Sequence, residues 1–232
     1  LILRSGLIDS YAYERIADAQ IALGQTDAAL QNYELAVNAK RSLVPLLVLR
    51  EKLAQIYISL ARPSDAVAQY DAILTLAQNT PYRANISFTA AKALLDSGDV
   101  ENGLNRMNTV FTSYPNTATA YSAMQELIAN GADIDGLQRG KTAFIAGDYQ
   151  AAINAFNEYT TTRQLAAIPA ELHLMLGRAY REIGNSDAAT VAFQTIIDQY
   201  PQDPLFGDAL LERGRTRFLA GDIPTAAADV EK

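Results

Sequence analysis

The feature that most constrains this chain is a turn phrase that recurs at a fixed interval. Each copy has a helix-like stretch, a turn built around Gly or Ala, and a second stretch that opens with small residues. The turn residues are spaced by 37 positions, with one interval of 49: Gly24, Ala61, Gly98, Gly147, Gly184 and Gly221. Such a period is typical of repeat architectures, in which each unit packs mainly on its neighbours. The 232 residues are therefore expected to form a solenoid rather than a domain with a single core.

Each repeat has the parts of a helical hairpin. Gly accepts the left-handed φ at which many helices end, and a polar residue after it can cap the next helix. Three aspartates directly follow their glycine and are expected to be caps: Asp99, Asp148 and Asp222. Three hydroxyl residues are expected to cap slightly later: Thr26, Ser64 and Ser186. Because no run of alternating β-branched residues is present, the sequence predicts an all-α fold without strands.

Small residues mark the predicted helix crossings. Seven positions before each turn residue the chain has only Gly or Ala: Ala17, Ala54, Ala91, Gly140, Gly177 and Gly214. Five positions after it the same holds: Ala29, Ala66, Gly103, Ala152, Ala189 and Ala226. Two helices approach closely only where neither carries bulk. Four positions further on, larger side chains are expected to fill the space between neighbouring hairpins: Tyr33, Tyr70, Met107, Phe156, Phe193 and Val230.

From Ser10 to Lys232 this pattern resembles the tetratricopeptide repeat family, including the terminal proline in Tyr114-Pro115 and Tyr200-Pro201. The resemblance implies antiparallel helix pairs, stacked as a right-handed superhelix that binds protein or peptide partners along its concave face. The chain departs from the family in having no Trp and a period longer than the usual ~34 residues.

The long interval predicts an extra helix, because residues 118–130 carry Tyr121, Met124, Leu127 and Ile128 at helical spacing. We predict about six hairpins with this helix between the third and fourth. The expected divisions are 1–9, the end of a preceding segment or a linker; 10–116, hairpins one to three; 117–132, the extra helix; and 133–232, hairpins four to six, the last one truncated. Since the chain lacks an initial Met and stops inside an expected helix, we expect it to be an excised segment of a longer protein.

The residues that could carry chemistry indicate no enzyme, metal site or cofactor in this segment. Gly140-Lys141-Thr142 lacks the earlier glycine and the strand of a phosphate-binding loop. His173 is the single histidine, and there is no cysteine, so zinc and nucleophile sets are incomplete. A net charge of −7 disfavours nucleic acid as a partner. No apolar run approaches the ~20 residues that span a bilayer.

A candidate partner-binding groove follows the first helix of each hairpin, which lines the groove in the resembled family. In four successive hairpins a cation stands one turn after an apolar residue: Phe88 and Lys92, Leu137 and Lys141, Leu174 and Arg178, Leu211 and Arg215. Such a row would suit an extended, anionic protein or peptide ligand. The alternative is that the cations are merely solvated and the leucines pack on the neighbouring hairpin.

A weaker resemblance concerns the phrase from Tyr200 to Leu210. It is similar to linkers in bacterial cell-envelope repeat proteins, including the superhelix that precedes the catalytic domain of soluble lytic transglycosylases. This favours an extracytoplasmic or periplasmic location and, through the parent protein, a connection to peptidoglycan. We therefore expect a non-catalytic scaffold for protein–protein interaction. The alternative is the accessory superhelix of a lytic transglycosylase whose catalytic domain lies beyond Lys232, because the Glu-Ser motif of that domain is absent here.

Overall fold

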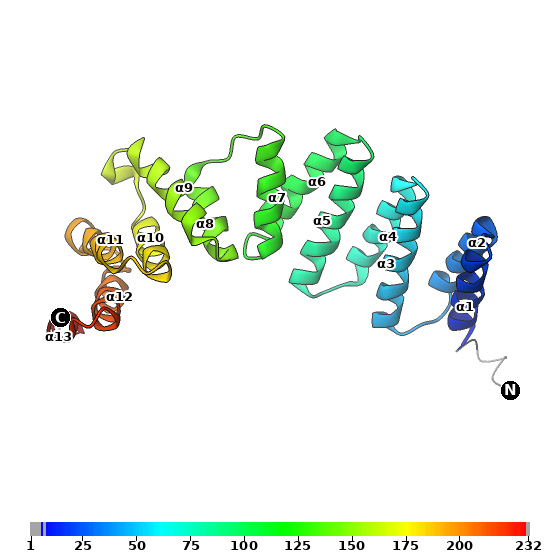
Figure 1. Cartoon of the computed structure of the whole chain (residues 1–232), viewed down its shortest axis with the longest axis horizontal. Coiled ribbons are helices and arrows are strands. Elements are labelled where there is room, and N and C mark those ends of the chain that lie inside the picture. Colours follow the sequence, from blue (N-terminus) through cyan, green and yellow to red (C-terminus); the bar gives the residue numbers. More distant parts are fainter. Residues whose placement is uncertain (1–5, 7, 231–232) are drawn as a thin grey trace. The chain divides into compact units, whose positions relative to one another are not determined.

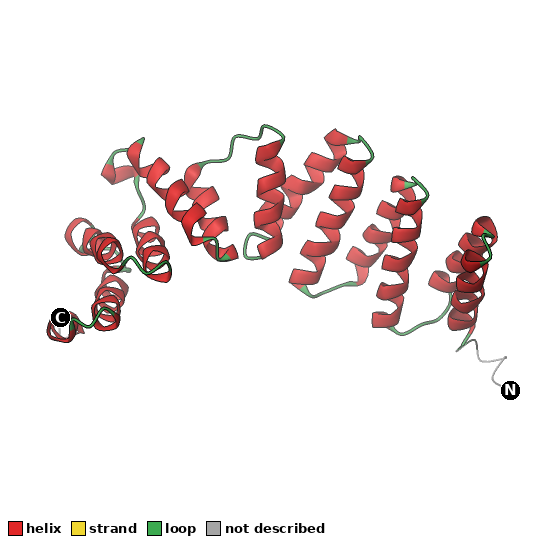
Figure 2. Cartoon of the chain, viewed as in Figure 1, coloured by secondary structure: helices red, strands yellow, loops and turns green. Residues whose placement is uncertain are grey.

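A computed structural model describes Gly6 and residues 8–230 of the chain, without the side chain of Val230. Over these residues it contains thirteen α-helices, one short 3₁₀ helix and no strand (Figure 2). The chain divides into two compact units between Tyr114 and Pro115. Of the segment predicted to precede the repeats, residues 1–5 and 7 lie outside the described part, as do residues 231–232 at the other end.

Unit 1 consists of three antiparallel helix pairs (Figure 1). The helices pair in chain order: α1 (Asp9–Ala22) with α2 (Thr26–Asn38), α3 (Leu43–Ser59) with α4 (Pro63–Leu76), and α5 (Thr80–Asp96) with α6 (Val100–Ser113). Each pair is one sequence repeat, so the period of 37 corresponds to one hairpin.

Unit 2 begins with a helix that has no partner of its own repeat, α7 (Ala118–Ala129), which packs against α8. Three further pairs follow: α8 (Gly136–Ala146) with α9 (Tyr149–Thr161), α10 (Ala170–Glu182) with α11 (Ser186–Gln199), and α12 (Phe206–Leu219) with α13 (Ile223–Val230). The 3₁₀ helix η2 (Leu165–Ala167) lies between α9 and α10. The predicted all-α fold of six hairpins with one extra helix is confirmed.

The turn residues have the backbone conformation that the sequence predicts. All six have positive φ, from +55° at Ala61 to +89° at Gly98. Ala61 is the single non-glycine with positive φ in the described residues. A Cβ atom makes this conformation costly, so Ala61 is a strained position in the second hairpin.

We expect Ala61→Gly to raise the free energy of unfolding by about 1 kcal/mol, because Gly adopts positive φ without the steric cost. Equilibrium urea unfolding measures the change. The control is Ala68→Gly at an exposed position inside α4, where Gly should lower stability by about 1 kcal/mol. The same sign for both substitutions would contradict this account of the turn.

The predicted helix caps are right where Asp follows the turn and wrong elsewhere. The Asp99 side chain accepts from Asn102 N, and Asp148 Oδ1 accepts from Ala151 N at 3.0 Å. Thr26, Ser64 and Ser186 are not caps, because their helices begin at or before them. The turn has a constant length, so the residue directly after the turn residue occupies the cap position. At Gln25 and Arg62 the side chain makes no cap bond, whereas Asn185 Oδ1 accepts from Ala188 N at 3.1 Å.

The small residues before the turns are buried, and in the first two hairpins of unit 2 an aromatic ring covers them. An added Cβ on Gly140 would lie 2.4 Å from the Phe156 ring, and one on Gly177 would lie 2.5 Å from the Phe193 ring. Both rings come from the second helix of the same hairpin.

The rings also belong to buried clusters that extend into the next hairpin. Phe156 shares a cluster with Leu172 and Leu176 of α10, and Phe193 shares one with Ala209 of α12. The aromatic column therefore packs inside its own hairpin and also toward the following one, as expected.

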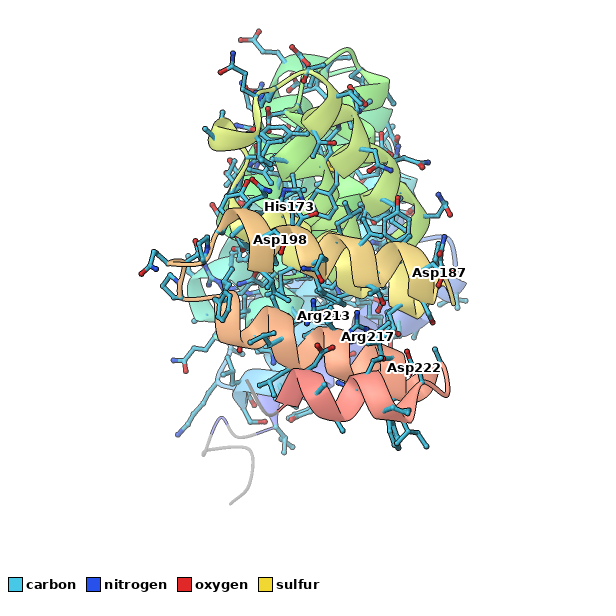
Figure 3. The ribbon with its side chains drawn as sticks, turned by 90° about the vertical axis from the view of Figure 1, so that its left-hand side faces the viewer. His173, Asp187, Asp198, Arg213, Arg217 and Asp222 are labelled. Atoms are coloured by element: carbon cyan, nitrogen blue, oxygen red, sulfur yellow. The ribbon has the colours of Figure 1, made fainter. Side chains whose placement is uncertain are left out.

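A buried ion pair joins the two helices of the last hairpin. Asp229 on α13 accepts from the guanidinium groups of Arg213 and Arg217 on α12, which Figure 3 labels. Arg213 also donates to Gln194 on α11. The Arg213 and Asp229 side chains are almost fully buried. Removing one partner of such a pair leaves a buried charge without compensation.

His173 on α10 is a second polar group inside unit 2. It is 8% exposed and lies beside Tyr200, with 5.8 Å between ring centroids. Its Nε2 atom is buried and has no hydrogen-bond partner among the described residues. Burial lowers the pKa of His173 below its usual value, because the charged imidazolium would lose its hydration.

We expect the chain to lose stability as the pH falls through about 6.5, because the unfolded chain then protonates His173 before the folded chain does. His173→Leu should remove this part of the pH dependence. Leu is the residue at the equivalent position of the next hairpin, Leu210, which is buried there. Thermal unfolding of both proteins between pH 7.5 and pH 5 tests this. Parallel pH profiles would contradict it.

Candidate functional site

The first helices of unit 1 lie side by side and are joined by side chains. Lys52 on α3 forms ion pairs with Glu14 at 3.3 Å and with Asp18, both on α1. Tyr82 on α5 donates to Glu51 Oε1 on α3 at 2.5 Å. Helices α1, α3 and α5 therefore present one continuous side of the unit.

Two equivalent clefts open on this side, which we call the first-helix groove. The cleft between α1 and α3 has a volume of about 560 Å³ and includes six residues: Asp18, Ile21, Lys52, Gln55, Ile56 and Ser59. The cleft between α3 and α5 has a volume of about 580 Å³ and includes the six residues 37 positions later: Gln55, Ile58, Thr89, Lys92, Ala93 and Asp96. The groove thus repeats with the sequence.

Each cleft combines an apolar floor with a rim whose charges are paired. Ile21 and Ile58 are 38% and 37% exposed, which is high for Ile. On the rim, Lys52 pairs with Asp18, and Lys92 Nζ lies 3.2 Å from Asp96 Oδ1. Burial by itself would raise the pKa of Asp18, but hydrogen bonds from Lys52 and Tyr33 hold it below its usual value. The groove is therefore locally neutral, with apolar surface accessible between the ion pairs.

One position after the small crossing residue of each first helix stands a residue whose place we call the groove position. In four hairpins this residue is matched to the large residue on the second helix. Tyr33 OH donates to Asp18 Oδ1 at 2.5 Å, and Gln55 Nε2 donates to Tyr70 OH at 2.6 Å. In the first two hairpins of unit 2 the groove position is a cation, and the large residue is a Phe without a hydroxyl: Lys141 with Phe156, and Arg178 with Phe193. A buried hydroxyl thus occurs where a hydrogen-bonding partner faces it.

The predicted row of cations and apolar residues falls into two parts. In unit 1, Phe88 is partly buried on α5, and Lys92 lines the second cleft. In unit 2, Lys141 Nζ lies 2.5 Å from Glu171 Oε2, and Arg178 Nε lies 2.7 Å from Glu212 Oε1. Both carboxylates belong to the first helix of the following hairpin. These two cations therefore link neighbouring hairpins.

The apolar members of that row differ in exposure. Leu174 is 5% exposed and belongs to the core around Phe193, so it is not accessible to a ligand in this structure. Leu137 is partly buried against the core. Leu211 is 56% exposed and lies with Arg215 in a cleft of about 340 Å³ between α12 and α13.

Ile21 and Ile58 were not among the predicted site residues. Both stand three positions after the groove position, and their equivalents in unit 2 are Phe144, Arg181 and Phe218. Phe218 is 61% exposed and lines the cleft that holds Leu211 and Arg215. Arg181 Nη1 donates to Glu212 Oε2, so an ion pair stands where unit 1 has an accessible Ile. Burial by itself would raise the pKa of Glu212, but Arg181 and Arg178 lower it.

The residues considered for other chemistry have structural positions. Lys141 lies in the middle of α8, and His173 is buried. In the described part of the chain, no three His, Cys, Asp or Glu side chains gather where they could hold a metal ion. Among the described helices, none is both long and apolar enough to cross a membrane.

Comparison with known proteins gives two findings and one negative result. Tetratricopeptide repeat models match residues 10–43, 137–204 and 174–232, which together make up more than half of the chain. No curated protein matches the sequence. Several solved structures of low identity are similar to parts of this one.

One of these structures is MamA from Desulfovibrio magneticus RS-1, residues 41 to the end, with 17% identity over 79% of this chain and 90% of the other, and a TM-score of 0.35. Another is a tetratricopeptide repeat protein from Parabacteroides merdae, with 14% identity over 95% and 90% and a TM-score of 0.37. A crystal structure of MamA protein has 18% identity over 97% and 89% and a TM-score of 0.35. The repeating hairpins and the matches to the repeat models agree, and this chain belongs to the tetratricopeptide repeat family.

Proposed function

We propose that this chain is a non-catalytic scaffold that binds a segment of a partner protein in the first-helix groove of unit 1. The observation that supports the proposal most directly is the repetition of the cleft. Two clefts of nearly equal volume recur at the sequence period, each with an accessible Ile. Their rim charges are already paired, so a bound segment would insert uncharged apolar side chains.

The spacing of the clefts fits an extended segment. Neighbouring packed helices are about 8 to 10 Å apart, and an extended chain in the polyproline II conformation advances about 3.1 Å per residue with about three residues per turn. Side chains about three residues apart would therefore enter successive clefts. Lys92, at the edge of the second cleft, could in addition meet a carboxylate of the ligand if it leaves Asp96.

The test is to select random twelve-residue peptides on the intact chain and to measure their affinity by calorimetry. Ile58→Lys should weaken the selected peptides by about tenfold or more, because it places a charge on the apolar floor. Val191→Lys is the matched control, since Val191 is exposed on α11, outside the groove. Equal affinity of both variants and the wild type would refute the groove.

A second part of the proposal concerns the basic row of unit 2 and an anionic ligand. Leu211 and Arg215 share a cleft, and Arg215 makes no ion pair with a described residue, which favours this end of the row. Arg215→Glu should abolish binding of an acidic peptide while the helicity stays unchanged, because Arg215, unlike Arg178, does not pair with Glu212. If the variant binds the acidic peptide like the wild type, the basic row of unit 2 is not a binding site.

The cell-envelope location and the accessory role in a lytic transglycosylase remain alternatives within this proposal. They depend on the phrase from Tyr200 to Leu210. In the structure, Tyr200 OH donates to Ile168 O at 2.8 Å, and Asp203 Oδ1 accepts from Leu205 N at 2.9 Å. These bonds give the phrase a structural role as the connection between α11 and α12. Affinity for purified muropeptides, compared with affinity for the selected peptides, would separate the accessory role in a lytic transglycosylase from the role of a scaffold for protein–protein interaction.

A further inference from the structure

A larger cleft lies in unit 1 outside the first-helix groove. It has a volume of about 740 Å³ and runs along α2 beside the second hairpin. We call it the outer cleft and define it by six of its residues: Asp27, Gln31, Glu34, Leu35, Tyr57 and Arg62. Leu35, in the middle of α2, is 50% exposed there. The repeat itself offers a comparison that indicates what this cleft lacks.

At four joints of the chain, the tenth residue after the turn residue makes a contact with the following hairpin. The pairs are Glu34 with Tyr57 OH at 2.5 Å, Asp71 with Arg106 at 2.7 and 2.8 Å, Asn157 with Tyr180 OH at 3.1 Å, and Gln194 with Arg213. This position is therefore the polar joint between successive hairpins.

The two carboxylates at this joint position have different partners. Asp71 accepts hydrogen bonds from two nitrogens of the Arg106 guanidinium, whereas Glu34 accepts one hydrogen bond from the neutral hydroxyl of Tyr57. The residue equivalent to Arg106 in the preceding hairpin is Gln69, which is buried and accepts from Arg50 at 2.7 Å. Arg50 attracts Glu34 at longer range but forms no ion pair with it.

The charges around Glu34 do not supply the missing cation. Arg62 is 2.7 Å from Asp65 and lies over the Tyr57 ring at 4.7 Å, so its own charge is already matched. Asp27, two turns before Glu34 on the same face of α2, makes no ion pair with a described residue. The outer cleft thus presents two carboxylates that form no ion pair with a described residue, although Arg62 attracts Asp27 and Arg50 attracts Glu34 at longer range. They lie next to the exposed Leu35.

We propose that the outer cleft binds an arginine-bearing segment of a partner protein. The guanidinium of this segment pairs with the Glu34 carboxylate in the way that the Arg106 guanidinium pairs with the Asp71 carboxylate. An apolar residue beside the arginine covers Leu35. Bidentate contact between arginine and carboxylate favours Arg over Lys at this position. The site is separate from the first-helix groove, so neither depends on the other.

The probe is the acetylated and amidated peptide Ser-Leu-Arg-Ser-Leu-Arg-Ser, titrated into the full isotope-labelled chain and followed by amide chemical shifts. We expect shifts in α2 and around Tyr57 and Arg62, and none for the peptide with Glu in place of Arg. Glu34→Gln should weaken binding by about tenfold or more, because the carboxylate charge is lost while the acceptor for Tyr57 remains. The control is Glu101→Gln, an exposed carboxylate on α6 outside the cleft, which should leave the affinity unchanged.

Several results would overturn the proposal. They are no shift at millimolar peptide, shifts outside the outer cleft, equal affinity of Glu34→Gln and Glu101→Gln, or equal binding when Lys replaces Arg in the peptide. Self-association of the wild type that Glu34→Gln abolishes would assign the cleft to a second copy of the chain and not to a partner protein. Ile58→Lys should bind the arginine peptide like the wild type, so failure of the outer cleft and failure of the first-helix groove are distinguishable.

Discussion

Asp229→Ala is expected to lower the free energy of unfolding by about 3 kcal/mol, because it leaves two guanidinium groups, one of them fully buried, without their carboxylate. Arg213 forms two bonds with Asp229, and Arg217 forms a third. The loss should appear first as fraying of α13, measured by hydrogen exchange of its amides, and then in the urea midpoint.

A double substitution separates the charge effect from the loss of packing. The residues equivalent to Arg213 and Asp229 in the preceding hairpin are Leu176 and Ala192, both buried. Combining Arg213→Leu with Asp229→Ala therefore installs a pair that this fold already uses. We expect the double variant to regain most of the lost stability, since an apolar pair replaces a buried ion pair at little or no cost. A double variant less stable than Asp229→Ala would contradict this explanation.

Gly177→Leu is expected to lower the free energy of unfolding by about 2 kcal/mol. Overpacking of a core costs about 1 to 3 kcal/mol or more, and the better helix propensity of Leu returns about 1 kcal/mol. The cost is at the upper end because even the Cβ would lie 2.5 Å from the Phe193 ring, which is fully buried and has no free space to move into.

The matched control for Gly177→Leu is Gly207→Leu. Gly207 is the second residue of α12, and no atom lies within 4 Å of the position of an added Cβ. This variant should unfold at a urea concentration equal to or above that of the wild type. If both Leu variants unfold like the wild type, Gly177 does not form the close contact that the structure assigns to it.

The candidate site could be predicted only in part, because exposure depends on the neighbouring hairpin. Leu174 and Leu211 occupy the same position of successive repeats and have the same chemistry, yet the first is buried and the second is half exposed. Likewise, no pattern within one repeat reveals that Arg178 and Arg181 share Glu212 of the next hairpin. The sequence shows Asp18 at the groove position where Tyr33 is the large residue, and Arg178 where Phe193 is the large residue. Only the structure shows that these two positions face each other, because Tyr33 OH donates to Asp18 Oδ1.

The sequence by itself determined the helices, the turns and their period. Local rules decide these features: Gly accepts positive φ at the turns, small residues permit close packing, and apolar residues at helical spacing indicated α7 in the long interval. The tertiary structure decided which side chains are accessible and which charges are compensated. Glu34 and Asp71 show the reason, since the next hairpin brings a neutral tyrosine hydroxyl to the first carboxylate and an arginine to the second.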